Sequence, residues 1–404
     1  MFIILASFNN MKKKILNFFT VTLGGMANGL FATLIIGTIF GTIALIFSSA
    51  GSNAFCNFMS TALGTKSGLA FVLQGLTGAG IGVGIALSLK MDTLKTICLG
   101  IVGEIAAFFS FNITKDGKIP AKIPPFFEDG KQFFKPGDPL TIFLVCIAVA
   151  LLVKLIFKKK TSVDILIVPL FFCTAGLILS LGIRYPAAYV TFAVQWLINI
   201  STNAVPFVMG IVVAVLMGMA LTAPISSAAI GAIIFSLPNG LSIAAALADP
   251  AYSGLLIASG AAIVGCSTQM VGFAIQSRKD NNIGQIISIG IGTSMLQIKN
   301  IIRKPVIWLP TIIASAILGP ISTCWLKLVC PGASAGMGTA GLVGQIGTFS
   351  AMGNTWQTWV GIFVLQIIAP LALVFAIDLL FRKIGWIKDS DFALKREEEE
   401  QTQN

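Results

Sequence analysis

The amino-acid sequence predicts an all-α polytopic membrane protein with about ten transmembrane helices and several broken or re-entrant helices. Three observations support this fold class: 56% of the 404 residues are hydrophobic, only 11% are charged, and the mean hydropathy is +0.91. A soluble fold of this size needs a far more polar surface than these residues can supply. We therefore expect a lipid bilayer to surround most of the chain.

Each predicted span is an apolar run of about 20 residues, the length that crosses a hydrocarbon layer of roughly 30 Å as a helix. The clearest runs are 21–47, 68–89, 96–112, 140–157, 163–183, 186–203, 206–223, 252–275, 306–326 and 358–381. Three weaker stretches, 226–247, 284–298 and 331–352, are interrupted by Pro, Asn, Gln or Gly. We interpret them as broken helices, with re-entrant segments near 224–247 and 331–352.

Basic clusters beside the span ends predict the orientation of the chain. Lys12–Lys14 place the N-terminal segment, 1–19, in the cytoplasm, and Lys158–Lys160 return to that side after four spans. The loop 113–139 is then exported, although its five lysines disagree with the positive-inside rule. Residues 386–404 form an acidic cytoplasmic tail on the same reasoning. The net charge of +11 thus indicates a multi-pass protein of a bacterial cytoplasmic membrane rather than a nucleic-acid binder.

Histidine does not occur in the sequence. Its imidazole is the commonest general base and metal ligand, and the usual phospho-acceptor of phosphorelay proteins. The seven cysteines contain no CxxC pair, so we interpret them as small hydrophobic residues that are buried in or beside the apolar runs. No Walker A motif is present, and Gly336-Met-Gly338-Thr-Ala-Gly341 lacks the βαβ context of a dinucleotide site, so we interpret it as close helix packing or an unwound segment. We expect no catalytic residues, no metal and no cofactor.

Glu104 lies in the middle of the predicted span 96–112. A charged group at membrane depth is costly unless it faces a partner or water. Two interpretations follow. Glu104 is either a coupling carboxylate for protons or substrate, or a structural group paired with Lys95 or satisfied by neighbouring amides.

Neutral polar side chains gather in the broken segments of the second half of the chain. Pro224 interrupts its helix there, so neighbouring carbonyls and hydroxyls become available to a ligand. The candidate substrate-binding residues are Thr222, Ser226, Ser227, Asn239, Gln269, Gln297, Asn300 and Gln345. Amides and hydroxyls with almost no charge indicate a site for a neutral, hydroxyl-rich solute. Helix caps and interhelical hydrogen bonds would account for the same residues one at a time.

Six segments carry a resemblance to a known family. They are PGDPL (136–140), TSVDILIVP (161–169), ALTAPISSAAIG (220–231), GCSTQMVGFAIQS (265–277), IGTSMLQIKNIIRKP (291–305) and ASAGMGTAGLVGQIG (333–347). In this order they resemble the phosphotransferase-system enzyme IIC type found in perfringolysin-regulator-like membrane proteins, over residues 20–385. The resemblance implies a sugar-permease fold similar to glucose-superfamily IIC domains, which work as homodimers with IIA and IIB proteins.

The sequence departs from that family at one informative motif. Glucose-type IIC domains carry an Ile-Thr-Glu-Pro-Ile-like motif whose glutamate holds sugar hydroxyls, and residues 221–225 read Leu-Thr-Ala-Pro-Ile. Ala223 therefore replaces the carboxylate. Those domains also use a histidine near the sugar, which this sequence lacks. Both differences put phosphorylation by this chain in doubt.

We therefore predict a IIC-like permease for a small polar solute, a sugar or sugar derivative. Residues 20–185 would form a scaffold and dimerisation domain, and residues 186–385 a substrate-binding domain. Two other interpretations are open. One is a membrane sensor or regulator derived from a IIC permease, and the other is an ion-coupled secondary transporter that uses Glu104.

Overall fold

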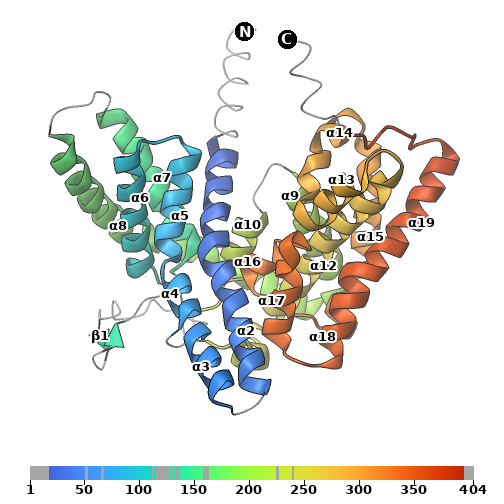
Figure 1. The fold of residues 1–404 in the computed structure, drawn as a ribbon, viewed down its shortest axis with the longest axis horizontal. Coiled ribbons are helices and arrows are strands. Elements are labelled where there is room, and N and C mark those ends of the chain that lie inside the picture. Colours follow the sequence, from blue (N-terminus) through green and yellow to red (C-terminus); the bar gives the residue numbers. More distant parts are fainter. Residues whose placement is uncertain are drawn as a thin grey trace, which may run out of the picture. The chain divides into compact units, whose positions relative to one another are not determined.

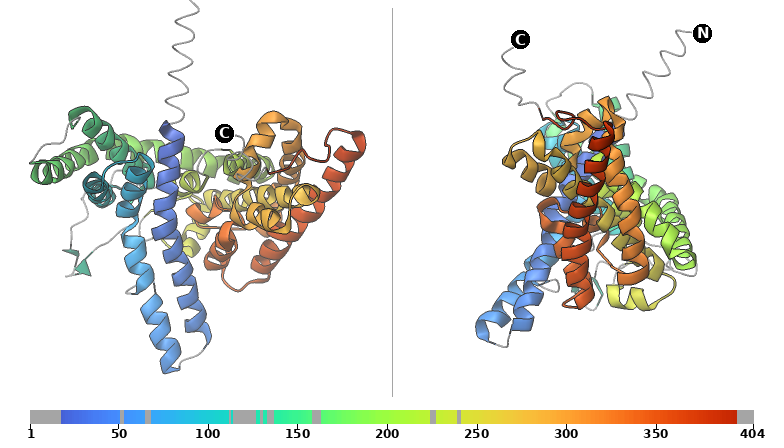
Figure 2. Two further views of the ribbon diagram at one scale, coloured as in Figure 1. Left: turned by 45° about the horizontal axis from the view of Figure 1, so that its top comes forward. Right: turned by 90° about the vertical axis from the view of Figure 1, so that its right-hand side faces the viewer.

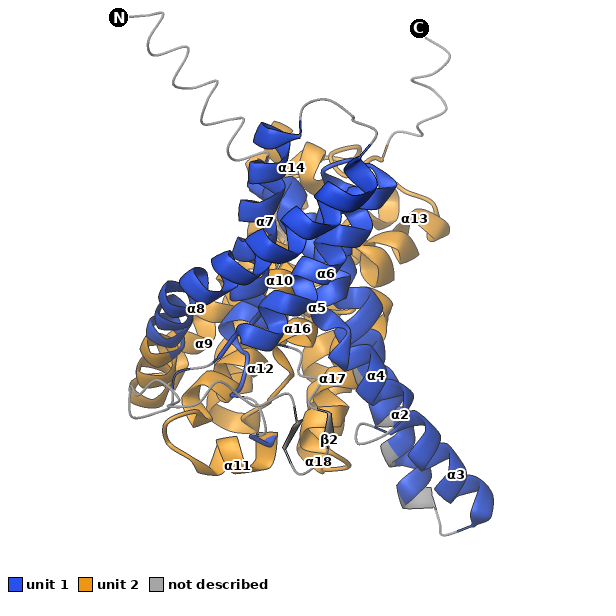
Figure 3. Ribbon diagram, turned by 90° about the vertical axis from the view of Figure 1, so that its left-hand side faces the viewer, with its two compact units in different colours: residues 1–195, 232–242 blue, residues 196–231, 243–404 orange. Residues whose placement is uncertain are grey.

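The computed structural model describes residues 18–50, 53–64, 68–111, 113, 127–128, 131–132, 137–157, 163–223, 227–238 and 241–394. These residues are helices and their connections, except for the antiparallel pair β1 (Phe127–Glu128) and β2 (Lys131–Gln132) (Figure 1). The predicted all-α class is confirmed. The described residues divide into two compact units, 1–195 with 232–242 and 196–231 with 243–404 (Figure 3). The roles predicted for the two halves stay predictions.

Six described helices are long and apolar enough to cross a membrane. They are Phe18–Ser48, Pro139–Ile156, Asp164–Ala204, Ser253–Lys279, Pro305–Leu326 and Trp356–Ile384. A seventh span is formed if the pair Leu69–Gly75 and Thr77–Ser88, bent by 54°, counts as one. Three further apolar helices of this part of the chain are shorter, at Ala54–Leu63, Pro206–Thr222 and Ile283–Gly292.

Unit 1 contains the first spans. Its elements are η1 (Phe31–Ile35, π-helical), α2 (Ile36–Ala50), α3 (Ala54–Leu63), α4 (Leu69–Gly75), α5 (Thr77–Ser88), α6 (Thr93–Phe109), β1, β2, α7 (Pro139–Ile156) and most of α8 (Asp164–Ala204). The η1–α2 helix and the bent α4–α5 pair run side by side (Figure 2). Gly84 of α5 packs directly on the backbone of Gly25, where a Cβ atom would overlap the Gly25 carbonyl oxygen. Glycines thus let these backbones approach closely.

The helix α8 contains two of the predicted spans. The runs 163–183 and 186–203 lie in one continuous helix, because α8 extends through both for 41 residues with Pro169 and Pro186 inside it. Arg184, which interrupts the apolar pattern, is only 7% exposed. Its guanidinium donates to the Tyr185 hydroxyl at 2.9 Å and lies 4.8 Å from the centre of the same ring. The charge is therefore accommodated without ending the helix.

Unit 2 is built around a buried central helix, α12 (Ser253–Gln276), which packs against α9 (Pro206–Thr222), α15 (Leu309–Pro320) and α19 (Ala369–Ile384). The helix α10 (Ser227–Ile234) belongs to unit 2 up to Gly231 and to unit 1 from Ala232. The other elements of unit 2 are α11 (Ile243–Ala248), η2 (Ser277–Lys279), α13 (Ile283–Ile287), η3 (Ser288–Gly292), η4 (Ser294–Gln297), α14 (Ile298–Arg303), η5 (Pro305–Trp308), η6 (Ile321–Leu326), α16 (Gly332–Ala335), η7 (Ala340–Leu342), α17 (Val343–Met352), α18 (Trp356–Val360) and η8 (Gly361–Ile368). The burial of α12 includes polar side chains such as Ser259, Thr268 and Gln269.

The weaker stretches of the sequence are interrupted, as predicted. Residues 284–298 change from α13 to the π-helical η3, become extended at Thr293, and continue as the 3₁₀ turn η4. Residues 331–352 form α16 and α17, with Gly338 and Gly341 between them in the left-handed region. In 226–247 the structure describes α10 and α11.

Residues 386–394 differ from the solvated tail that their position predicts. The ring of Phe392 is completely buried among Phe273, Ile289, Ile301, Ile307, Phe381 and Ile387. The segment is therefore docked onto unit 2, because burial of these apolar side chains stabilises the ordered state. We call residues 388–394 the C-terminal clasp. The acidic stretch of the predicted tail, 395–404, lies outside the described residues.

Candidate functional site

Gln269, in α12, is the centre of a buried polar cluster in unit 2. Its Oε1 accepts hydrogen bonds from Trp308 Nε1 at 2.9 Å, from Thr311 Oγ1 at 2.9 Å and from Thr222 Oγ1 at 3.4 Å. Thr222 Oγ1 also shares a hydrogen bond of 2.9 Å with Ser294 Oγ. Five elements, α9, α12, η4, η5 and α15, thus direct one polar side chain each to the same place. We call these five residues the Gln269 cluster.

One amide donor of this cluster has no partner. Gln269 is 0% exposed, and its Nε2 makes no hydrogen bond to the described residues. Leaving a buried donor unpaired costs about 1–3 kcal/mol. An acceptor from a bound solute would remove this cost, so Nε2 is the group of the cluster best suited to hold a ligand oxygen.

Close packing of α9 on α12 positions the amide. A Cβ atom on Gly218 would lie 2.9 Å from Gln269 Cγ, and one on Gly265 would overlap the carbonyl oxygen of Ala214. Glycine at both positions therefore permits the contact between the two helices. It also leaves room for the Gln269 side chain beside Thr222.

A second chain of buried amides and hydroxyls lies in α17 and η8. Gln345 Nε2 donates to Gln366 Oε1 at 2.9 Å, and Gln366 Nε2 donates to Thr348 Oγ1 at 2.9 Å. Thr348 Oγ1 in turn donates a hydrogen bond to the Gly344 carbonyl at 2.9 Å. Gln345 Oε1 is buried without a partner among the described residues. This second cluster offers an acceptor where the Gln269 cluster offers a donor.

The glycine motif at 336–341 is a packed turn against α12. Gly338 has φ +59°, and a Cβ atom there would lie 2.8–3.1 Å from the backbone of Cys266 and Ser267. Thr339 Oγ1 donates to the Gly290 carbonyl at 2.5 Å, and Ser227 Oγ donates to the Gly336 carbonyl at 2.6 Å. The structure thus uses Ser227, a candidate solute contact, to hold this turn.

Two other candidates contact the C-terminal clasp. Gln297 Nε2 donates to the Phe392 carbonyl at 3.0 Å, and Asn300 Nδ2 donates to Gln297 Oε1 at 2.8 Å and to the Ala393 carbonyl at 3.3 Å. These amides therefore bind the chain itself and are not part of the Gln269 cluster. Ser226 and Asn239 lie outside the described residues.

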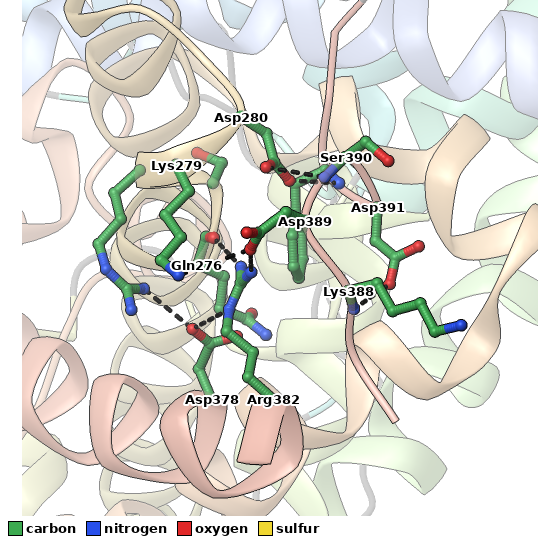
Figure 4. Close-up of polar contacts among 12 residues, drawn as sticks. Gln276, Lys279, Asp280, Asp378, Arg382, Lys388, Asp389, Ser390 and Asp391 are labelled. Carbon is green, nitrogen blue, oxygen red and sulfur yellow. Dashed lines mark hydrogen bonds and ion pairs between the residues drawn. The ribbon is translucent and has the colours of Figure 1, made fainter. Parts of the chain in front are cut away.

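The clasp is also fixed by charged groups. Asp378 of α19 is fully buried and accepts from Arg278 Nη1 and Arg382 Nε, both at 2.9 Å. Arg382 extends the network to Asp389 at 2.6 Å and to the Gln276 carbonyl at 2.9 Å (Figure 4). The end of α12, the last turns of α19 and the clasp are thereby joined through the guanidinium of Arg382.

Glu104 in unit 1 has a structural contact. Its Oε2 accepts from the backbone nitrogen of Ala79 at 3.0 Å, in the first turn of α5 and next to the bend between α4 and α5. Lys95 pairs instead with Asp92 at 2.8 Å. First-turn N–H groups have no partner within their helix, so the carboxylate satisfies one of them. Of the interpretations raised for Glu104, this geometry matches satisfaction by a neighbouring amide.

Sequence reasoning missed several members of these clusters. Trp308, Thr311, Thr348 and Gln366 were not candidates, and Ser294 appeared only within a quoted motif. The sequence pattern that could have indicated these residues was weak. Gln366 is a lone amide inside an apolar run. Trp308 and Thr311 lie at the start of a predicted span, where tryptophan is also common as an interfacial anchor.

The comparisons with known proteins agree with this architecture. The sequence matches a family profile described as "Phosphotransferase system, EIIC" over residues 20–394. No curated protein and no solved structure matched the chain. The matched residues include the Gln269 cluster, the second amide cluster and the clasp. The chain therefore belongs to the phosphotransferase-system EIIC family and is a multi-pass membrane permease component of sugar transport.

Proposed function

We propose that this permease binds a neutral, hydroxyl-rich solute, a sugar or sugar derivative, at the Gln269 cluster of unit 2. The observation that carries the proposal is the fully buried, unpaired Nε2 of Gln269. The cluster contains two hydroxyls on threonine, one on serine, an amide and an indole N–H, and no charged side chain. These groups match the hydrogen-bonding capacity of a sugar, which has both donors and acceptors and no net charge.

Phosphorylation of the solute would require other proteins. The sequence contains no histidine that could accept a phosphoryl group. Members of the family work with IIA and IIB partners, and we propose that any phosphoryl transfer reaches the solute through such partners. Without them, this chain would act as a permease alone or as a sensor of the same solute.

The solute assignment can be tested by binding. The purified full-length protein is screened by thermal shift against sugars, amino sugars and polyols, because a ligand at 100 times its Kd stabilises the folded state by about 2.7 kcal/mol. The hit is then measured on Gln269→Leu and on Trp308→Phe, which removes only the indole N–H. We expect Gln269→Leu to weaken binding about tenfold or more. Trp308→Phe should have a smaller effect.

The matched control is Gln195→Leu in unit 1, where the same amide is lost from a hydrogen bond of 2.9 Å to the Ser236 carbonyl. This variant should bind the solute as the unmodified chain does. Equal affinities of Gln269→Leu and the unmodified chain would contradict the proposal, since the amide would then serve helix packing only.

Dimerisation and the type of membrane stay predictions from the resemblance. The helix α8 exposes an apolar face with Ile165, Leu166, Leu170 and Ile178, each more than 60% exposed, which either lipid or a second copy would cover. We propose a homodimer of the bacterial cytoplasmic membrane that forms through unit 1. Disulfide crosslinking of Ile178→Cys in membranes should give a dimer band, and its absence at several α8 positions would contradict this interface.

A further inference from the structure

We propose that unit 1 binds the phosphate headgroup of an anionic phospholipid in a pocket at its lysine-rich end. The pocket has a volume of about 580 Å³. It lies between the start of the first helix, the turn that joins α5 to α6, and the last turns of α7. This site is remote in sequence from the Gln269 cluster and does not depend on the solute proposed for it.

Three lysines and one acid line the pocket, namely Lys90, Lys95, Lys154 and Asp92. Lys95 Nζ is paired with Asp92 Oδ2 at 2.8 Å, whereas Lys90 and Lys154 are exposed and form no ion pair within the described part of the chain. The lining therefore carries two positive charges that the protein does not neutralise there. A phosphate diester would supply the matching negative charge.

The backbone conformation of Lys90, which lines the pocket, is an unfavourable one for a lysine. Lys90 follows the C-terminus of α5 with φ +54°, a left-handed conformation that glycine adopts without strain. Its N–H bonds to the Leu87 carbonyl at 3.0 Å, and the next N–H, of Met91, bonds to the Ala86 carbonyl at 3.0 Å, as in a helix-terminating turn. The turn between α5 and α6 thus places Lys90, at a position that favours glycine, in the lining of the pocket.

The remaining wall is apolar and suits an acyl chain. Phe18, Leu89, Leu151 and Phe157 are among the lining residues, and Leu151 is 45% exposed. Leu155, one turn further along α7, is 65% exposed and continues the apolar surface. A free phosphate would satisfy the lysines but leave this wall uncovered, so a phospholipid accounts for more of the site than a soluble anion does.

The location of the pocket fits a lipid headgroup. Phe18 and Lys154 lie at the ends of two helices that can cross a membrane, and both line the same pocket. These span ends therefore share one side of unit 1, the side that the basic clusters Lys12–Lys14 and Lys158–Lys160 predict to be cytoplasmic. Lysines at span ends lie at the depth of lipid phosphates.

The test uses the full-length protein in detergent and measures bound lipid by native mass spectrometry. The probes are phosphatidylglycerol and phosphatidylcholine, with sn-glycerol 3-phosphate and inorganic phosphate as soluble arms. Since one lysine near an anionic lipid contributes about fivefold in affinity, Lys90→Gln with Lys154→Gln should weaken phosphatidylglycerol binding about 25-fold. Phosphatidylcholine binding should change little. The soluble arms should not compete at millimolar concentration.

Two further variants separate this site from general surface charge and from misfolding. Lys383→Gln removes an exposed lysine at the end of α19 and should change binding less than twofold. Asp92→Asn keeps an N-cap acceptor for α6 but removes the competing carboxylate, so it should tighten phosphatidylglycerol binding. Unchanged binding in the double variant, an equal loss in Lys383→Gln, or no gain in Asp92→Asn would overturn the proposal. Competition by inorganic phosphate would overturn the lipid assignment.

Discussion

Replacement of Phe392 by alanine should release the C-terminal clasp from unit 2 without unfolding the rest of the protein. The phenylalanine ring is completely buried, its centre lies 6.4 Å from that of Phe273, and the Arg382 guanidinium lies 5.7 Å from the same ring. Truncation of a buried phenylalanine to alanine costs about 3–5 kcal/mol. The question is whether the other contacts of the clasp can hold it without the ring.

The other contacts are hydrogen bonds and ion pairs. They come from the amides Gln297 and Asn300, from the ion pairs of Arg382 with Asp389 and of Lys304 with Asp391, both at 2.6 Å, and from the turn after α12. Asp280 accepts from the backbone nitrogens of Ser390 and Phe392 at 2.9 and 3.0 Å, and Asn281 Oδ1 accepts from that of Leu394 at 2.9 Å. Each such bond contributes about 0.5–1.5 kcal/mol net, or up to about 3 kcal/mol when one partner is charged. Ordering each residue of the clasp costs about 1–2 kcal/mol. The polar contacts therefore offset much of the cost of ordering the chain, and we expect burial of the ring to decide whether the clasp stays docked.

Limited proteolysis measures this release directly. Trypsin cleaves after Lys388, which is in the clasp, and mass spectrometry follows the product with time. A loss of about 3 kcal/mol raises the population of the released clasp about 100-fold, so cleavage should be at least tenfold faster in Phe392→Ala. The melting temperature of the remainder should fall little. The control is Phe207→Ala, because Phe207 is 58% exposed on α9.

Two outcomes would refute this reasoning. If cleavage after Lys388 is as slow in Phe392→Ala as in the unmodified chain, the ring is not the anchor of the clasp. If the whole protein melts at a much lower temperature while the clasp stays protected, Phe392 belongs to the general core of unit 2.

Three other predictions follow from named contacts. Glu104→Gln should fold and take up solute normally, because an amide oxygen can still accept a hydrogen bond from the Ala79 N–H. Glu104→Ala should destabilise the protein by about 1–3 kcal/mol in thermal melts. Loss of uptake, or of its pH dependence, in a folded Glu104→Gln protein would instead support ion coupling. Gly265→Ala should destabilise unit 2 by about 1–3 kcal/mol or more, because the new Cβ atom would overlap the Ala214 carbonyl oxygen. The control is Gly182→Ala, because a Cβ atom at Gly182 meets no atom within 4 Å. Gly130→Cys should react with a membrane-impermeant thiol reagent in intact cells if the loop 113–139 is exported, and labelling only after lysis would reverse the predicted orientation.

Much of the architecture could be predicted from local patterns. The all-α class and the positions of the long apolar helices follow from the length of each apolar run, whereas the number of spans stays a prediction. The breaks near 288–297 and 336–342 follow from glycine and polar residues inside apolar stretches. Two differences had a tertiary cause. The apolar runs 163–183 and 186–203 were predicted as two spans, but Arg184 between them is buried against the rings of Tyr185 and Phe111 and the helix continues. Residues 386–394 seemed to be a solvated tail because the apolar surface that buries Phe392 comes from distant segments.

The candidate site divides in the same way. Gln269 and Thr222 were predicted from their residue type and from the broken helices around them, and the structure joins them in one cluster. Gln297 and Asn300 have the same residue types and the same kind of segment, yet they bind the clasp. No local pattern distinguishes an amide that keeps an unpaired buried donor, such as Gln269, from one that pairs with another part of the chain.

The sequence by itself determined the environment of this protein, because the free energy of transferring an apolar run into lipid depends on the residues of that run alone. It also shows that these 404 residues contain no histidine, so none of them can carry a phosphoryl group on an imidazole. Only the tertiary structure decided which polar groups meet. Gln269 finds Trp308 39 residues away, and Gln297 finds the Phe392 carbonyl 95 residues away. Such pairings depend on how the helices pack, and packing is a property of the whole fold.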